Sequence, residues 1–296
     1  MASARPVIGL TCGDPAGVGP EVIERALASG KLGDDFEYRI IGAGDGFRRG
    51  QPSRESAQAA LEALELSSRL ALAGEIAAVV TGPIHKKRMQ EVGFEFPGQT
   101  EFFATRWKTP DFAMCLTGGK LTVALVTAHV PLKDVAGMLS SAEIVRVGKL
   151  LQGFLWRVLG RVPKIGVAGL NPHAGEEGLM GHEEIQIIAP AVAQLKGLNQ
   201  TEEGKSAEWS GPFSPDTLFY RAVQGEFDGV LCMYHDQGLI PLKLHAFHDG
   251  VNVTLGLPVP RTSPDHGTAF EIAGKGLARA DSMIAAVRLA GQMIKQ

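Results

Sequence analysis

The chain has 296 residues, of which 45% are hydrophobic and 21% charged, a balance typical of a globular protein with a sizeable core. Its 29 Lys and Arg against 32 Asp and Glu residues give a formal net charge of -3 without long blocks of like charge, which argues against nucleic-acid partners. The cysteines Cys12, Cys115 and Cys232 are scattered and lack CxxC spacing, which argues against a disulfide framework or a zinc knuckle. No apolar run is long enough to span a membrane, and the first residues lack a signal-peptide core. We therefore expect a cytoplasmic protein without a membrane partner.

Short apolar runs that predict strands alternate with helical patterns along the chain. The strand runs are 6–11, 38–44, 77–82, 121–128, 164–170, 228–234 and 251–257. A helix is predicted over 53–73, and a capping box at Ser140 and Glu143 predicts the start of another. The polar stretch 198–211 predicts a surface loop. This alternation favours an α/β fold with a largely parallel sheet.

Three of the eight histidines lie just past predicted strands. His129 follows the run 121–128, His173 follows 164–170, and His235 follows 228–234. In an open parallel sheet, ligands bind beyond the carboxyl ends of the strands, so the three imidazoles could converge there. Three protein ligands would leave positions open for substrate, as in a catalytic zinc site. A loop hydrogen bond explains any one histidine more simply, but three at equivalent positions favour a metal site.

Polar residues after His235 extend this candidate site. Asp236 could orient its neighbour, take part in proton transfer or serve the structure alone. Three further residues could bind a phosphate or carboxylate: Lys243 has a point charge, Asn252 an amide and Arg261 a planar guanidinium. Binding to such a ligand and exposure on the solvated surface are about equally favoured for this set.

Two glycine-containing segments could meet a cofactor. The segment GDPAGVGPE (13–21) lies between a strand and a helix, but its glycines do not fit GxGxxG, so a structural turn and an anion contact are equally favoured. HGTAFEIAGKG (266–276) resembles the cofactor signature of isocitrate and isopropylmalate dehydrogenases. That resemblance implies cofactor contacts at His266, Gly267, Thr268 and Glu271. An acidic residue suits the ribose hydroxyls of NAD and would repel the 2'-phosphate of NADP, so NAD is favoured.

Taken together, the motifs resemble the PdxA family of 4-hydroxythreonine-4-phosphate dehydrogenases, from about Ile8 to the end. The motifs are GDPAGVGPE, TGPIHKK, GQTEFFA, TAHVPLKDV, GLNPHAGEEGLMG, GPFSPDTLF, YHDQGLIPLK and VNVTLGLPVPRTSPDHGTA, in that order. The resemblance implies metal ligands at His129, His173 and His235. It implies substrate contacts at Gln99, Thr100, Lys243, Asn252 and Arg261.

The chain departs from the family pattern at two places. Gln99 stands where the family carries a histidine, so a group that can become positively charged is replaced by a neutral amide. The segment around residues 44–56 is also shorter than in typical members. Both departures bear on which substrate the chain uses.

The resemblance further implies a two-domain isocitrate/isopropylmalate dehydrogenase-like fold with the active site in the interdomain cleft. The expected domains are 1–90 plus 268–296, and 91–267, the second carrying the metal and substrate residues and the dimer interface. The implied homodimer shares its sites, with the His129 and His173 equivalents from one subunit and the His235 equivalent from the other.

The implied reaction is oxidation of 4-phosphohydroxy-L-threonine by NAD, with decarboxylation to 3-amino-2-oxopropyl phosphate in pyridoxal phosphate (vitamin B6) biosynthesis. One divalent ion, zinc, cobalt or magnesium, would assist by stabilising an alkoxide. Lys243 and Asp236 are candidate proton acceptors, and His85 with Lys86 is a weaker candidate.

Three alternatives stay open. A relative could oxidise a 4-phosphorylated threonate or erythronate, or a dihydrodiol, with the same metal and NAD motifs. A metal-dependent hydrolase could use three histidines to activate water, although the HGTAFEIAGKG segment counts against it. A binding protein without turnover is disfavoured by the retention of all three histidines.

Overall fold

The computed structural model describes residues 5–42, 46–198 and 206–295, which fall into two compact units. Unit 1 comprises residues 1–110 and 251–295, and unit 2 comprises residues 111–250. Residues 43–45 of the shortened segment and 199–205 of the predicted loop lie outside the described residues. None of the helices among the described residues has both the length and the apolar character needed to cross a membrane.

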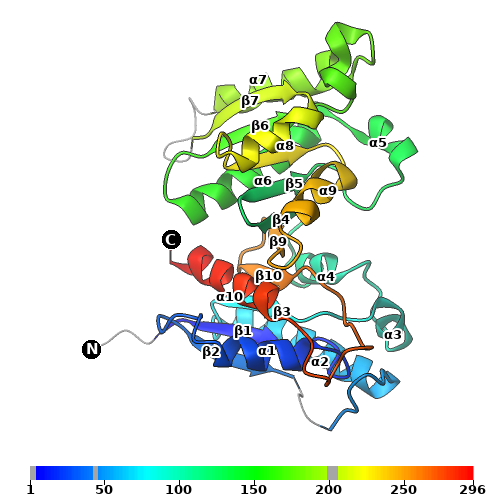
Figure 1. Cartoon of the computed structure of the whole chain (residues 1–296), viewed down its shortest axis with the longest axis vertical. Helices are drawn as coiled ribbons and strands as arrows, with labels where there is room; N and C mark the ends of the chain where they lie inside the picture. Colours follow the sequence, from blue (N-terminus) through cyan, green and yellow to red (C-terminus); the bar gives the residue numbers. More distant parts are fainter. Residues whose placement is uncertain (1–4, 43–45, 199–205, 296) are drawn as a thin grey trace. The chain divides into compact units, whose positions relative to one another are not determined.

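In unit 1 the strand order is β2-β1-β3-β10-β9. The first four strands are parallel and β9 is antiparallel to β10. The elements are β1 (Val7–Thr11), α1 (Gly19–Ala28), β2 (Glu37–Ile41), α2 (Arg54–Leu72), β3 (Ala78–Thr81), α3 (Lys86–Glu91), α4 (Gln99–Arg106), β9 (Val251–Leu255), β10 (Arg261–Pro264) and α10 (Asp281–Ile294). The last helix, α10, packs on β10, β3 and β1 and beside α1, so the two ends of the chain build one core (Figure 1).

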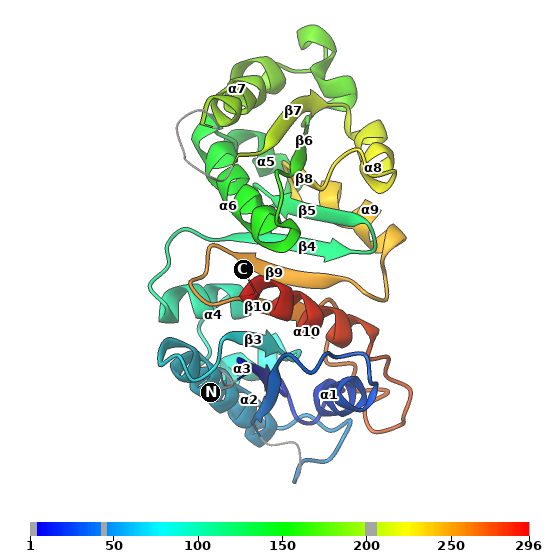
Figure 2. The same cartoon turned by 90° about the vertical axis from the view of Figure 1, so that its left-hand side faces the viewer.

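In unit 2 the strand order is β4-β5-β8-β6-β7. The hairpin β4–β5 is antiparallel, and β5, β8, β6 and β7 run parallel. The elements are β4 (Ala113–Gly118), β5 (Leu121–Leu125), α5 (Leu132–Met138), α6 (Ser141–Leu159), β6 (Lys164–Ala168), η1 (Pro172–Gly178), η2 (Glu184–Ile188), α7 (Ala189–Leu198), β7 (Glu208–Phe213), α8 (Pro215–Val223), β8 (Gly229–Cys232) and α9 (His235–His245). Figure 2 shows α6 and α7 on one side of these strands and α8 and α9 on the other.

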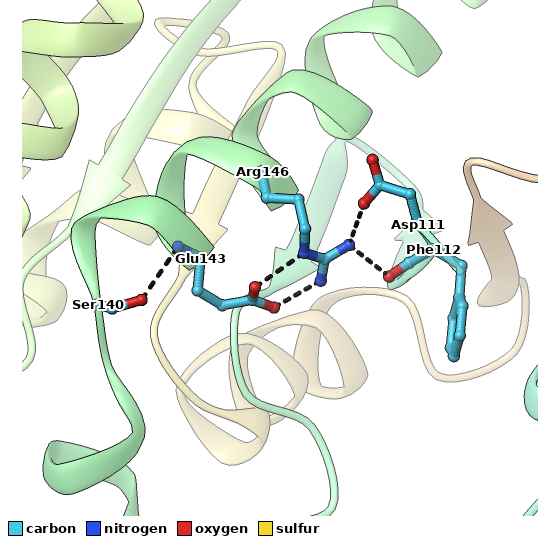
Figure 3. A network of polar contacts seen from close by, with 5 residues as sticks. All are labelled: Asp111, Phe112, Ser140, Glu143 and Arg146. Carbon is cyan, nitrogen blue, oxygen red and sulfur yellow. Dashed lines mark hydrogen bonds and ion pairs between the residues drawn. The ribbon is translucent and has the colours of Figure 1, made fainter. Parts of the chain in front are cut away.

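The predicted α/β fold with a largely parallel sheet is confirmed, and so are the helices predicted at 53–73 and after Ser140. Ser53 caps α2, and the Ser140 hydroxyl accepts a hydrogen bond from the Glu143 backbone N–H at the start of α6. The Glu143 carboxylate instead binds Arg146, which also reaches Asp111 (Figure 3). These contacts raise the pKa of Arg146, and they tie α6 to the segment before β4.

Part of the predicted loop 198–211 is wrong, because residues 208–211 belong to β7. Trp209 on this strand is buried, and its indole N–H donates to Gln152 on α6. Burial of the tryptophan against that helix outweighs the polar and glycine content of the segment, so local composition was a poor guide here.

The boundaries between the units differ from the expected ones. Residues 91–110 and 251–267, expected in the second domain, lie in unit 1. Arg106 forms an ion pair with Glu65 on α2 at 2.6 Å, and Trp107 donates to Ser68 on the same helix. Strand β10 pairs with β3, and β9 pairs with β10. These contacts hold both segments to the sheet of unit 1.

Candidate functional site

A cavity of about 600 Å³ opens at the carboxyl ends of β5 and β8 in unit 2. The rings of His129 and His235 lie against it with their centroids 5.5 Å apart and their planes inclined by 42°. His129 is exposed and His235 is half-buried. The cavity is lined by Ala128, His129, Val130, Pro131, Leu132, Val135, Tyr234, His235, Asp236 and Ile240. Two of the three strand-end histidines therefore share one opening.

Asp236 supports one of these histidines. Its carboxylate oxygen Oδ1 lies 2.6 Å from Nδ1 of His235. A histidine held by a carboxylate at one ring nitrogen presents the other nitrogen, here Nε2, in a fixed orientation, as metal-binding histidines commonly do. The neighbouring Tyr234 has its pKa raised, first by burial and then by Asp236, so its phenol stays neutral near neutral pH.

His173 lies in an unusual turn after β6. The five residues 173–177 all have positive φ, which for His173 is 52°. The imidazole is exposed, and His173 is not among the described residues that line the cavity beside His129. Within the described ranges, no three His, Cys, Asp or Glu side chains already stand together as a metal-binding group. The structure thus brings His129 and His235 together and keeps His173 on its own loop.

In unit 1, Arg261 is a buried cation with neutral hydrogen-bonding partners. Its side chain is 3% exposed, and its guanidinium donates to Thr81 Oγ1 (2.6 Å) and Thr254 Oγ1 (3.3 Å). The group also lies 6.0 Å from the ring centre of Phe103. Burial lowers the pKa of Arg261 to about 10, partly opposed by Glu101. Its Nε atom has no partner among the described residues. A buried charge in this state is stabilised strongly by an anionic ligand.

The other substrate candidates of unit 1 lie around this arginine. Gln99 accepts a hydrogen bond from Arg261 at 3.2 Å and donates to the carbonyl of Gly82 at 3.0 Å. Thr100 and Thr254 share a hydrogen bond of 3.2 Å. Asn252 is on β9, two residues before Thr254 and hence on the same face of the strand, and its Oδ1 is buried without a partner among the described atoms. Lys243 belongs to unit 2, on α9.

The candidate cofactor segment, 266–276, packs on the glycine-containing turn 13–21 within unit 1. The backbone N–H of Val18 donates to the carbonyl of Thr268 at 2.9 Å, and a Cβ on Gly17 would lie 2.8 Å from that oxygen. Glu21 accepts from the Gly274 N–H at 3.0 Å. His266 is half-buried, its Nε2 lacks a partner among the described atoms, and Glu271 is exposed. Gly267 follows His266 and is exposed too.

The weaker base candidates of the TGPIHKK motif have a structural role or lie in solvent. His85 caps α3, since its Nδ1 accepts from the Arg88 N–H at 3.3 Å, and its ring lies 5.6 Å from that of Phe270. Lys86 is exposed. Because His85 caps α3, its position is explained without a catalytic role.

Several polar residues at these sites were missed from the sequence. In unit 1 they are Thr81 and Thr254, which bind Arg261, and in unit 2 they are Gln237 and Glu184, which are buried near the strand ends. Thr81 lies near the end of the predicted strand 77–82, and this position was an available signal. Glu184 carries no local pattern that distinguishes it from a surface carboxylate.

Comparison with known proteins gives a consistent picture. The family model of the pyridoxal phosphate biosynthetic protein PdxA matches residues 23–290. A 4-hydroxythreonine-4-phosphate dehydrogenase of Desulforapulum autotrophicum is 41% identical, over 98% of this chain and 96% of its own length. A D-threonate 4-phosphate dehydrogenase of Pectobacterium atrosepticum is 38% identical, over 97% of this chain and 99% of its own.

Solved structures agree with this result. A crystal structure of 4-hydroxythreonine-4-phosphate dehydrogenase from Klebsiella pneumoniae is 36% identical and has a TM-score of 0.83, with both chains covered completely. A β-decarboxylating dehydrogenase from Thermococcus kodakarensis has a TM-score of 0.54 at 17% identity, over 98% of this chain and 84% of its own. The latter likeness concerns the fold alone and shows that the chain shares the fold of a β-decarboxylating dehydrogenase.

Proposed function

Because the chain belongs to the PdxA family of dehydrogenases, we propose that it oxidises 4-phosphohydroxy-L-threonine with NAD and one divalent metal ion, releasing carbon dioxide and 3-amino-2-oxopropyl phosphate. Family membership makes the chain an oxidoreductase of pyridoxal phosphate biosynthesis and removes the reason to consider a hydrolase or a binding protein. The substrate, cofactor and metal are the proposed part. The observation that carries the proposal is the placement of His129 and His235 at the carboxyl ends of the neighbouring strands β5 and β8, with Asp236 at Nδ1 of His235.

The donor set at the strand ends fits a divalent ion. Neutral imidazole is a good ligand for zinc and cobalt, and Asp236 on Nδ1 of His235 leaves Nε2 for coordination. In the shared site proposed below, His129 and His173 of one subunit and His235 of the partner subunit would hold the ion. A divalent ion supplies Lewis-acid catalysis, which makes an alcohol easier to deprotonate and stabilises negative charge on oxygen.

Residues of unit 1 would recognise the charged ends of the substrate. Arg261 offers a desolvated guanidinium for a phosphate or carboxylate, and Asn252 and Thr100 add neutral hydrogen-bonding groups. Gln99 orients Arg261 through its amide oxygen. Lys243 is the favoured proton acceptor of our two candidates, because Asp236 already holds His235.

Unpaired polar atoms around the cofactor segment fit a bound nucleotide. His266 Nε2 and Asp14 Oδ2 are both buried without a partner among the described atoms, and both lie in the segments that pack together in unit 1. Gly267 and Thr268 would bring backbone groups close to the cofactor, and Glu271 would accept hydrogen bonds from ribose hydroxyls. The carboxylate supports NAD rather than NADP.

We also propose that the protein acts in the cytoplasm as a homodimer with shared sites. The three cysteines are free thiols, which suits a reducing compartment. Large apolar side chains are exposed on α9 and beside it, namely Ile240, Leu244 and Phe247, which suits an interface with a second copy.

A mixing experiment tests the shared site. If His129 and His235 of one site come from different subunits, random mixing of inactive His129→Ala and His235→Ala subunits restores about a quarter of the activity, since half the dimers have one intact site. If both histidines serve the same site from one chain, as their 5.5 Å separation within the chain would also allow, mixing restores nothing.

One alternative substrate is supported by a specific residue. A 4-phosphothreonate lacks the ammonium group of 4-phosphohydroxy-L-threonine, and a relative with 38% identity carries the name D-threonate 4-phosphate dehydrogenase. Gln99 is a neutral amide at the position where the family pattern has histidine, and it contacts Arg261. A different substrate preference would therefore depend on this residue.

The decisive assay follows NADH formation with NAD and a divalent ion. Purified protein is given 4-phosphohydroxy-L-threonine, D-threonate 4-phosphate and D-erythronate 4-phosphate in parallel. We expect the highest kcat/KM with the first. A preference for the threonate would replace the proposed substrate, and no NADH from any of them with metal bound would refute the dehydrogenase proposal.

A further inference from the structure

The guanidinium of Arg261 is held by threonines on the two strands that flank β10. Thr81 ends β3, which pairs with β10 on one side, and Thr254 lies on β9, which pairs with it on the other. Nη2 of Arg261 donates to Thr81 Oγ1 at 2.6 Å, and Nη1 donates to Thr254 Oγ1 at 3.3 Å. Thr81 is 0% exposed and Thr254 is 2% exposed. Two neighbouring strands of one sheet thus fix the orientation of the guanidinium.

These partners leave the charge of Arg261 available to a ligand. A hydroxyl accepts a hydrogen bond without neutralising the cation, whereas a carboxylate in its place would form a buried ion pair and compete with an anion. A guanidinium has five N–H donors, and the side chains that accept from this one are Thr81, Thr254 and Gln99. Its Nε has no partner among the described atoms. The threonines therefore orient a buried cation that keeps donors for an anionic group.

Thr254 also connects Arg261 to Thr100 on α4. The hydroxyl oxygens of the two threonines lie 3.2 Å apart. Arginine can only donate, so the oxygen of Thr254 accepts from Arg261, and the proton of the same hydroxyl can be donated to Thr100. Thr100 is half-buried, and once it accepts this hydrogen bond its own proton is available to a ligand. One hydroxyl on β9 can thus orient two donors.

We propose that Thr81 and Thr254 are positioning residues for the anionic group of the substrate, its phosphate or its carboxylate. Both hold the guanidinium of Arg261, and Thr254 also directs the Thr100 hydroxyl toward the same group. This inference rests on the proposed function, in which Arg261 and Thr100 bind the substrate. Neither positioning residue touches substrate in it. All four residues belong to unit 1 of one chain, so their arrangement is independent of how the histidines of two subunits meet.

The test compares Thr81→Val with a matched change at Thr262. Valine has nearly the shape of threonine but lacks the hydroxyl. Thr262 on β10 is also 0% exposed, and its hydroxyl donates to the carbonyl of Ala286 at 2.9 Å. Thr262→Val therefore removes a buried hydroxyl hydrogen bond that does not involve Arg261. Thr81→Ser retains the hydroxyl and serves as the rescue variant.

Three quantities are measured for each protein. Calorimetry gives the affinity for 4-phosphohydroxy-L-threonine without NAD, and the affinity for phosphoethanolamine, which has the phosphate and ammonium groups but no carboxylate. Steady-state kinetics give kcat/KM and the KM for NAD. Chemical denaturation gives the free energy of unfolding.

We expect Thr81→Val to weaken binding of 4-phosphohydroxy-L-threonine by about tenfold, the effect of one lost hydrogen bond to a charged group, with an unchanged KM for NAD. Thr81→Ser should restore the affinity. Thr262→Val should lose about as much stability as Thr81→Val and bind substrate like wild type. Weaker binding of phosphoethanolamine as well would assign the phosphate to Arg261, and weaker binding of the substrate alone would assign the carboxylate. Unchanged substrate affinity in Thr81→Val, or an equal loss in Thr262→Val, would overturn the inference.

Two further comparisons keep the outcome decisive. If Thr81→Val does not fold, Thr254→Val takes its place, with Thr254→Ser as the rescue variant and the same expected direction. Wild type that neither binds nor oxidises 4-phosphohydroxy-L-threonine refutes the proposed function, whereas wild type that does both beside unaltered threonine variants refutes only the positioning role.

Discussion

The two units present their polar side chains in opposite ways. In unit 1 the charge proposed to bind substrate is buried, since Arg261 is 3% exposed and is surrounded by threonine hydroxyls, an amide and a phenyl ring. In unit 2 the histidines are exposed or half-buried, and Asp236, which holds His235, is exposed as well. On the proposed function, the difference means that unit 1 would bind an anion with a desolvated charge, whereas unit 2 would bind a metal ion with imidazoles that solvent can reach. Substitutions at the candidate site residues of the two units should therefore have different effects on activity and stability.

The largest effect is expected at an exposed histidine of unit 2. His129→Ala removes a proposed metal ligand, so NADH formation should fall to background, while the free energy of unfolding of the metal-free protein changes by about 0.5 kcal/mol or less because the side chain is exposed. Chemical denaturation and the NADH assay measure the two quantities. Retained activity would remove His129 from the metal site.

Arg261→Met should have the next largest effect. It tests whether the buried charge of unit 1 serves ligand binding or the stability of the fold. Loss of two charge-assisted hydrogen bonds to substrate, each worth about 1.5–3 kcal/mol, lowers kcat/KM by about a thousandfold. The ligand-free protein should be as stable as wild type or more so, because an uncompensated buried charge is replaced by an apolar chain of similar length. A marked loss of stability would mean that Arg261 serves the fold rather than the ligand.

Asp236→Asn tests whether the carboxylate of Asp236 supports His235 as a metal ligand. The amide keeps the size of the side chain but loses the negative charge beside His235 Nδ1, so zinc affinity should fall by about 10–100-fold. Competition with a chelator measures this change. An equal loss of activity at unchanged zinc affinity would point instead to proton transfer by Asp236.

The smallest effect is expected at Asp228, which supports unit 2 away from the histidines. Burial raises its pKa, but hydrogen bonds from Arg161 and the Lys164 N–H outweigh burial, and the net result is a pKa below the ordinary 3.8. The carboxylate therefore stabilises the fold fully above that value and loses its effect as the pH falls through the lowered pKa.

Asp228→Asn should accordingly lower the melting temperature by about 2 °C or less at pH 7, since the pair is largely solvent-screened, with kcat unchanged. The gap between the variant and wild type should close below pH 3.8. A gap that widens as the pH falls would contradict the sign of this pKa shift.

Much of the fold and the site could be predicted from the sequence where short stretches carry a recognisable pattern, such as an apolar strand run or a family motif. Apolar runs ending in His129 and His235 predicted two strand ends, and the structure places their rings together. The order of the motifs indicated the PdxA family, which is confirmed. These signals are local, and a single sequence carries them.

Other elements could not be predicted because their structure depends on contacts with residues that are distant in the sequence. Strand β10, RTSP, is polar and ends in proline, and it is a strand because β3 and β9 pair with it. Gln237 and Glu184 look like surface residues in the sequence, and their importance comes from the distant Gly169 and Leu170 that they bind. The boundary near residue 250 has no change in composition, so the expected boundary fell too late.

The most direct measurement of the central claim is a metal titration of stripped wild-type protein with NAD and 4-phosphohydroxy-L-threonine present. The claim predicts that NADH formation is absent without metal, rises with added zinc or cobalt, and reaches its maximum at one ion per active site. Undiminished NADH formation by the stripped protein would contradict it.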